Sequence, residues 1–103
     1  MLRLTVRFVV ESVGIESQSI LAKIESDQFD PDHLDSLVNS CLSKGLEEVK
    51  NMKLQSLRPL RPEISVVLTA DDDSAVRPSL HLCMNTIQRL AEVGASFDFD
   101  PYV

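Results

Sequence analysis

The fold is decided by residues 30–50, DPDHLDSLVNSCLSKGLEEVK. Asp30 and Pro31 suit the start of a helix, because aspartate caps the first N–H groups and proline needs no donor at the first helical position. Apolar residues then recur at steps of three and four, from Leu34 to Val49. This spacing predicts an amphipathic helix over about residues 31–50 with one apolar stripe. Gly45 lies inside it, at an expected cost of about 1 kcal/mol relative to alanine.

Segments on both sides of this helix alternate between apolar and polar residues, which is typical of strands with one buried face. The alternation predicts strands over residues 2–10, 63–70 and 97–102. Any strand over residues 53–58 must be short and at a sheet edge, because Pro59 and Pro62 follow it.

Residues 14–29 fit two patterns. Ile20, Leu21 and Ile24 would share a helix face, whereas Ile20, Ala22 and Ile24 would share a strand face. We expect a short helix or an irregular segment there.

A second helix is predicted to begin at Pro78 and to end at Gly94, which suits a left-handed C-terminal cap. Free thiols behave as small apolar side chains, so Cys41 and Cys83 are expected to be buried in the core. An exposed sulfur beside an imidazole would instead favour catalysis. The apolar stripe of the second helix is expected to contain Leu80, Cys83, Met84, Ile87, Leu90 and Ala91.

The length of 103 residues suits a single domain over residues 1–103. Two helices with one apolar stripe each would cover one face of a sheet. We therefore predict an α+β fold, a single-layer antiparallel sheet of three to four strands with two helices on one face. A strand at residues 53–58 would give the ferredoxin-like order β-α-β-β-α-β.

Charge and composition exclude several classes of partner. The chain has sixteen acidic and ten basic residues, which give a formal net charge of −6. This negative charge disfavours binding to nucleic acid or to anionic membranes. No apolar run approaches the twenty or so residues of a membrane span, and the cysteines form no disulfide framework. A cytoplasmic protein is the simplest interpretation.

Motifs for chemistry are sparse, so we predict no catalytic, cofactor-binding or metal-binding residues. His81 and Cys83 are two residues apart and would point in different directions on a helix, so they could not share one ion. The chain has three glycines and no glycine-rich phosphate loop. An enzyme that uses Asp98, Asp100 or His81 stays open as an alternative.

Candidate binding residues come from two charged regions. Asp30, Asp32 and Asp35 lie at the acidic end of the long helix, where they could steer a basic partner. Helix-dipole complementarity and solvation explain the same residues without a partner. Arg3 and Arg7 would share the outer face of the sheet with Val9 and Val67, a mixed cationic and apolar surface that suits a dimer or partner site.

The ending LAEVGASFDFDPYV, residues 90–103, resembles the ending of an uncharacterised family of small bacterial domains, in which a helix ends in a Leu-Ala-x-x-Gly-Ala-like turn before a final strand with aspartate. The resemblance covers about a seventh of the chain. It implies a bacterial origin and the same helix–glycine–strand ending, and it implies no catalytic residues.

Together these patterns predict a small acidic binding module that acts without catalysis on a protein partner, as an inhibitor, an immunity-type protein or an adaptor. The alternative is a regulatory domain that binds a small molecule and acts as a homodimer, since ferredoxin-like sheets often do both.

Overall fold

The computed structural model describes residues 2–12, 18–28, 30–51, 60–70 and 80–102. The chain is α+β, as its sequence predicts. Its elements in order are β1 (Leu2–Ser12), β2 (Gln18–Ser26), α1 (Pro31–Asn51), β3 (Leu60–Ala70), α2 (Met84–Val93) and β4 (Ser96–Tyr102).

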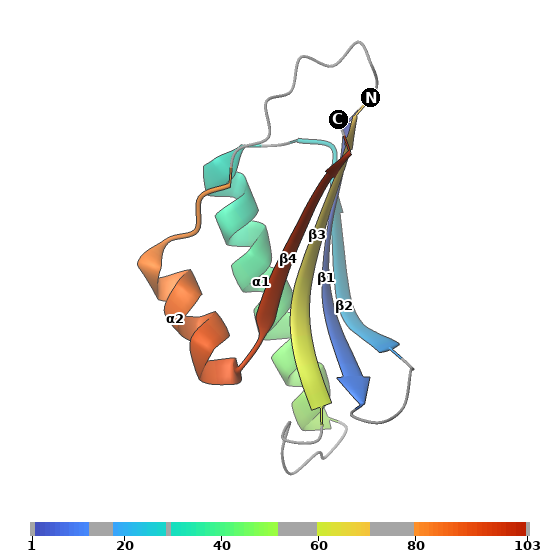
Figure 1. Ribbon diagram of the computed structural model, residues 1–103, viewed down its shortest axis with the longest axis vertical. Coiled ribbons are helices and arrows are strands. Elements are labelled where there is room, and N and C mark those ends of the chain that lie inside the picture. Colours follow the sequence, from blue (N-terminus) through green and yellow to red (C-terminus); the bar gives the residue numbers. More distant parts are fainter. Residues whose placement is uncertain (1, 13–17, 29, 52–59, 71–79, 103) are drawn as a thin grey trace.

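The strands form one four-stranded sheet in the order β2-β1-β3-β4, and both helices lie on the same side of it (Figure 1). β1 is antiparallel to β2 and to β3, but β3 and β4 are parallel. The prediction of a fully antiparallel sheet is therefore wrong for β4. α2 returns the chain to the end of the sheet where β3 begins, so β4 runs in the same direction as β3. The ferredoxin-like order is not confirmed, and residues 53–58 lie outside the described residues.

The start of α1 follows the predicted capping chemistry. The Asp30 carboxylate accepts the backbone N–H of Asp32 at 3.3 Å, and the Asp30 carbonyl accepts that of Leu34 at 2.8 Å. The apolar stripe of α1 then packs on the central strands. Side chains of α1 and of the two central strands are fully buried between the helix and the sheet. They are Leu34, Val38, Cys41 and Leu42 of α1, Leu4, Val6 and Phe8 of β1, and Ile64, Val66 and Leu68 of β3.

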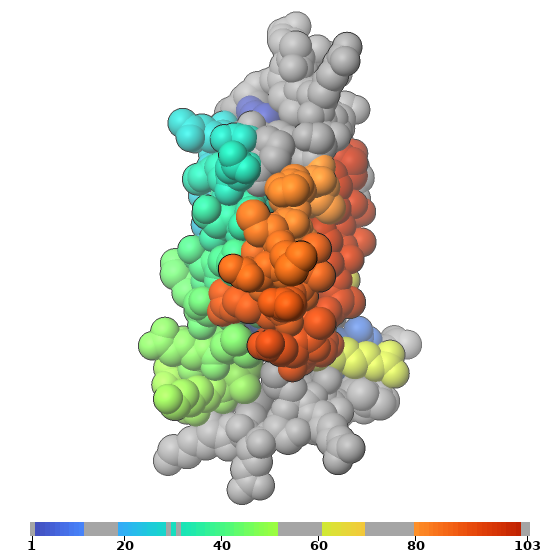
Figure 2. All heavy atoms as spheres, turned by 90° about the vertical axis from the view of Figure 1, so that its left-hand side faces the viewer, coloured from blue at the N-terminus to red at the C-terminus, as the bar shows by residue number. Residues whose placement is uncertain are grey.

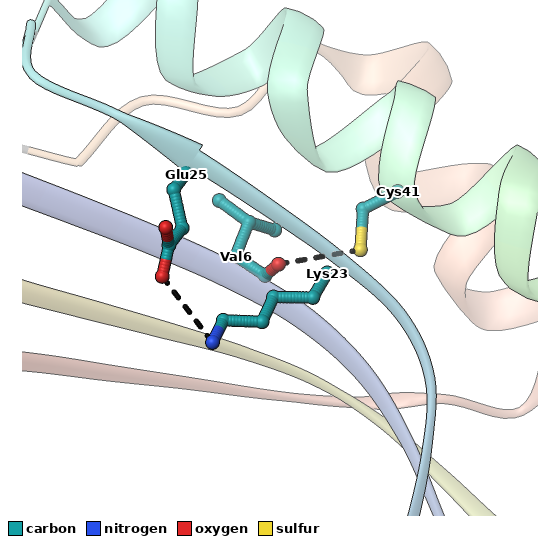
Figure 3. A network of polar contacts seen from close by, with 4 residues as sticks. All are labelled: Val6, Lys23, Glu25 and Cys41. Atoms are coloured by element: carbon teal, nitrogen blue, oxygen red, sulfur yellow. Dashed lines mark hydrogen bonds and ion pairs between the residues drawn. The ribbon is translucent and has the colours of Figure 1, made fainter.

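Cys41 and Gly45 show how closely α1 packs on β1. The buried Cys41 Sγ lies 3.6 Å from the Val6 carbonyl oxygen (Figure 3) and 3.7 Å from the Ala22 carbonyl oxygen, so these two acceptors share its one S–H. Burial raises the pKa of Cys41 to about 11. A Cβ atom added to Gly45 would lie 2.4 Å from Cγ of Phe8. Gly45 therefore leaves room for the Phe8 ring. From the sequence, Gly45 was expected only to lower the stability of the helix, and this contact was not predicted.

β2 replaces the helix or irregular segment expected within residues 14–29. Ala22 pairs with Phe8 and Ile24 with Val6. The register then shifts, so that Val9 pairs with Ile20 and Leu21 is the extra residue of a β-bulge. The bulge breaks the alternation of apolar residues, which explains why the sequence pattern was ambiguous there.

α2 begins at Met84, with Cys83 as its N-cap, and the predicted start at Pro78 lies outside the described residues. Residues 80–83 are not helical. The predicted end is confirmed. Gly94 adopts a left-handed conformation, with φ 75° and ψ 28°, and the N–H groups of Gly94 and Ala95 bond to the carbonyls of Ala91 and Leu90.

Candidate functional site

α2 is attached to α1 by a row of polar contacts, which we call the polar seam. It consists of Asp35, Asn39 and Ser43 on α1, at intervals of four residues, and Cys83, Thr86 and Arg89 on or next to α2, at intervals of three. These intervals place each set on one helix face. Asp35 Oδ1 accepts the backbone N–H of Cys83 at 2.9 Å. The side chain of Asp35 thus satisfies a backbone donor at the start of α2.

Thr86 and Arg89 continue the polar seam along the two helices. The Asn39 amide donates a hydrogen bond to the Thr86 hydroxyl, which is 1% exposed. Arg89 donates to Asn39 Oδ1 at 2.8 Å and to the Ser43 hydroxyl at 2.9 Å. A buried hydroxyl is tolerated only when it is hydrogen-bonded, so Thr86 determines which side of α2 faces α1.

Asp35 is held as a carboxylate by the polar seam. Burial acts to raise its pKa, but hydrogen bonds from the Cys83 backbone and the Thr86 hydroxyl, with the charge of His81, outweigh burial and lower the pKa. Asp35 is therefore ionised when it bonds to the start of α2, where negative charge is favoured by the helix dipole.

The predicted burial of Cys83 is wrong, since its side chain is exposed. A thiol at a helix N-terminus commonly has a lowered pKa. Here a side-chain hydrogen bond to Asp35 and the charge of Asp35, with smaller effects of burial and Asp32, raise the pKa of Cys83. The exposed sulfur thus interacts with a carboxylate that keeps it protonated, which is unfavourable for a nucleophilic cysteine.

The side of α2 opposite the polar seam is apolar and exposed. Met84 is 74% exposed, Ile87 is 53% exposed, and Ala91 is also exposed. We call these three residues the outer face of α2. Figure 2 shows α2 in the middle of this side of the molecule, between α1 and β4. Leu80, just before the helix, is 44% exposed. Large apolar side chains grouped in this way are typical of interaction sites.

The orientation of α2 differs from the sequence prediction. The predicted buried stripe contained Met84, Ile87 and Ala91, but the buried residues of α2 are Thr86 and Leu90. Leu82 and Val93 are partly buried against the core. Because a threonine lies at the centre of the inward side of α2, the spacing of apolar residues does not identify that side. Its hydrogen-bond partner, Asn39, lies 47 residues away in the chain.

The predicted binding residues lie on opposite sides of the molecule. Asp30 and Asp32 are exposed at the start of α1, and Asp35 belongs to the polar seam. Arg3 and Arg7 lie on the face of the sheet that has no helices, where Arg7 pairs with Ser65 in the register. The structure therefore does not bring the acidic and basic candidates into one site.

We call this second face the open face. The register places its side chains in rows across the four strands. Arg7 donates a hydrogen bond to the Ser65 hydroxyl at 3.5 Å, and Lys23 forms an ion pair with Glu25 at 3.2 Å (Figure 3). Its main members are Arg3, Thr5, Arg7 and Val9 of β1, Lys23 and Glu25 of β2, Glu63, Ser65, Val67 and Thr69 of β3, and Asp98 and Asp100 of β4.

Carboxylates on the open face repel one another. Burial raises the pKa of Glu63, and the charges of Asp98, Glu11 and Asp100 raise it further, against the lowering effect of Arg7. A hydrogen bond with Asp98 is the largest cause of the raised pKa of Asp100. This side of the open face has more negative charge than its own cations neutralise.

Among the described residues, no group of three or more His, Cys, Asp or Glu side chains is arranged to hold a metal ion. Neither helix within the described ranges is long and apolar enough to cross a membrane.

Comparisons with known protein families, with curated proteins and with solved structures find no match to this chain. The resemblance of residues 90–103 to a bacterial family therefore stays a prediction.

Proposed function

We propose that this protein is a non-catalytic binding module that contacts a protein partner through the outer face of α2. The observation that supports this most directly is the exposure of Met84 and Ile87, at 74% and 53%. Exposed methionine adapts to varied apolar surfaces and is common at binding sites. A helix face with apolar residues at positions i, i+3 and i+7 matches the pattern by which helices and grooves recognise each other.

Charge next to the outer face of α2 indicates the chemistry of the partner. Asp32 and Asp35 are close enough to Cys83 for their charges to raise its pKa, so acidic side chains lie near the start of α2. Asp30 and Asp32 are exposed, and the whole chain has a net charge of −6. A partner segment with apolar side chains next to lysine or arginine would complement both features.

The cysteines and the polar seam support binding in preference to catalysis. Cys41 is buried with a pKa of about 11, and Cys83 is kept protonated by Asp35. Neither thiol has the lowered pKa that nucleophilic catalysis requires. Asp35 uses its oxygens to hold α2, which is a structural role.

The test compares two aspartate substitutions at isoleucines of equal exposure. Ile87 on α2 and Ile20 on β2 are both 53% exposed. Affinity capture from the native cell with the wild type as bait would identify the partner, whose dissociation constant is then measured. Ile87→Asp should weaken binding at least about tenfold, because it places a charge in the centre of a desolvated contact. Ile20→Asp should change binding less than about threefold.

A second measurement tests the steering role of the acidic residues. Asp32→Lys should lower the association rate, and the wild-type rate should fall as the salt concentration rises. The proposal fails if Ile87→Asp and Ile20→Asp weaken binding equally, or if the captured protein binds Ile87→Asp as tightly as the wild type.

A further inference from the structure

α2 lacks the features that keep a helix stable by itself. It has ten residues, Met84–Val93, and isolated helices shorter than about 12–15 residues are marginal in water. Within these ten residues, the first turn has no acidic side chain and the last turn has no basic one, so the helix dipole is not offset by charges of α2 itself. Within the described part of the chain, the Cys83 side chain makes no capping hydrogen bond. α2 therefore depends on its contacts with the rest of the chain.

Those contacts are few and mainly polar. Thr86 and Leu90 are the buried residues of α2, and Val93 is partly buried. Asp35 accepts the backbone N–H of Cys83 at the start of the helix, so the cap that α2 lacks is supplied by α1. α2 lies on the surface beside α1 (Figure 2), whereas α1 buries a whole apolar stripe against the sheet. Because apolar burial is the main stabilising contribution to folding, α2 should be held less firmly than α1.

Asn39 is at the centre of the polar seam. Its side-chain amide donates hydrogen bonds to the Thr86 hydroxyl and, at 3.1 Å, to the Asp35 carbonyl. Its side-chain oxygen and its carbonyl oxygen accept hydrogen bonds from Arg89, at 2.8 Å and 3.4 Å. If Asn39 were released while α2 stayed docked, the buried Thr86 hydroxyl would lose this partner, which is costly. The polar seam should therefore break as a unit.

We propose that α2 undocks from α1 and loses its helical structure in one cooperative step, while α1 and β1 stay folded. When the polar seam breaks, α2 loses both the acceptor at its start and the hydrogen bond at its buried centre. A helix of ten residues that has lost these contacts unfolds. The native protein is then in equilibrium with a partly open state that keeps the packing of α1 on the sheet.

The polar seam thereby regulates the binding site on α2, a consequence that rests on the proposed function. Met84, Ile87 and Ala91 share one side only while α2 is helical. The undocked state has no outer face, so the apparent affinity for a partner falls in proportion to the docked fraction. Undocking itself needs no partner. The measurements below are made on the protein alone, and their results do not depend on whether the outer face of α2 binds anything.

Hydrogen exchange of the wild type, followed by NMR at increasing urea concentrations, measures the opening. The amides from Ile87 to Val93 should share one protection factor, at least about a hundredfold below that of the central strand β1. They should also share one urea dependence, smaller than that of β1 but above zero, because undocking exposes part of the buried surface. Protection and urea dependence equal to those of β1 would mean that α2 opens only by global unfolding. Graded protection without urea dependence would mean fraying from the helix ends. Either result would overturn the proposal.

Two substitutions separate undocking from global unfolding. Val6 is fully buried in β1, and its carbonyl oxygen lies 3.6 Å from Cys41 Sγ of α1, in packing that the undocked state keeps. Val6→Ala should therefore lower the protection of β1 at least about tenfold and leave that of α2 within about twofold. Asn39→Ala breaks contacts that are absent from both the undocked and the unfolded state. It should lower the protection of α2 and of β1 by the same factor, at least about tenfold. A loss of protection in α2 equal to that in β1 on Val6→Ala would contradict the proposal.

Asn85→Ala is the matched control for Asn39→Ala. Asn85 is exposed on α2, and the same change of side chain there should leave the protection of α2 and β1 within about threefold. If Asn85→Ala lowers the protection of α2 as much as Asn39→Ala does, the polar seam does not control undocking, and the proposal is wrong.

Discussion

α1 buries Leu34, Val38 and Leu42 against the sheet, whereas α2 holds its partner helix with polar side chains and leaves Met84 and Ile87 exposed. The inward side of α1 is a continuous apolar stripe. The inward side of α2 has Thr86 at its centre, held by Asn39. Both helices are amphipathic, but α2 also exposes apolar side chains on its outer face, in addition to Leu90 and Val93 on its inward side.

This difference separates a structural helix from one that is available for binding. Apolar burial is the main stabilising contribution to folding, so α1 should contribute more than α2 to the stability of the domain. Thr86 and Arg89 contribute specificity of orientation, because each of their hydrogen bonds fixes α2 at one rotation against α1. An apolar outer face on a helix so fixed is presented in a defined position, which lowers the entropy cost of binding.

The largest expected effect is at the centre of α1. Leu42→Ala removes a fully buried side chain and should lower the free energy of unfolding by about 2–5 kcal/mol, through lost burial and a residual cavity. Urea denaturation gives the value. If Leu42→Ala costs no more than Met84→Ala, the contrast between the two helices is wrong.

Gly45→Ala should be destabilising by about 1–3 kcal/mol, because the new methyl group would overlap the Phe8 ring. Helix propensity alone predicts the opposite sign, a gain of about 1 kcal/mol. Ser40→Ala, at an exposed position of the same helix, is the control and should change the free energy of unfolding by about a few tenths of 1 kcal/mol. Combining Gly45→Ala with Phe8→Leu in a double-mutant cycle should recover part of the loss, and additive effects would argue against the contact.

Asp35→Ala removes the acceptor at the start of α2 and should cost about 1 kcal/mol at neutral pH. Folding lowers the pKa of Asp35, so its contribution is complete above the ordinary value of 3.8 and is lost as the pH falls through the folded value. Thermal denaturation as a function of pH should therefore show the wild type and Asp35→Ala converging below that pH. Asp32→Ala, at an exposed position, should show a smaller difference throughout.

The smallest effect on stability is expected at the outer face of α2. Met84→Ser and Ile87→Ser remove exposed side chains and should each change the free energy of unfolding by less than about 0.5 kcal/mol. Chemical denaturation measures this, and the same variants should weaken partner binding. A loss of about 2 kcal/mol or more would show that these side chains belong to the core, against the orientation of α2 described above.

The parts of the fold that depend on neighbouring residues were predictable from the sequence. Asp30 caps α1, Gly94 ends α2, and β1 alternates as predicted. The segment at β2 was not recognised, because the bulge at Leu21 interrupts the alternation. The direction of β4 depends on how α2 crosses the sheet, which no local pattern contains.

The candidate site was less predictable, because its determinants are distant in the chain. The rotation of α2 depends on Asn39 and Thr86, which occur 47 residues apart. No local signal was available from the sequence, because Thr86 lies outside the predicted apolar stripe and suits the polar side of an amphipathic helix equally well. Arg3 and Arg7 were placed correctly with Val9 and Val67, because period-two alternation fixes which residues share a strand face.

The position of β1 between β2 and β3 has a consequence for the growing chain on the ribosome. β1 is synthesised before the other elements described here, and it can form a hairpin with β2 almost at once. Its second edge stays unpaired until β3, almost fifty residues after the end of β1, has emerged. An open edge beside Val6 and Phe8 is a template for pairing with other nascent chains. The interval before β3 docks is therefore the stage at which this chain is most exposed to such pairing.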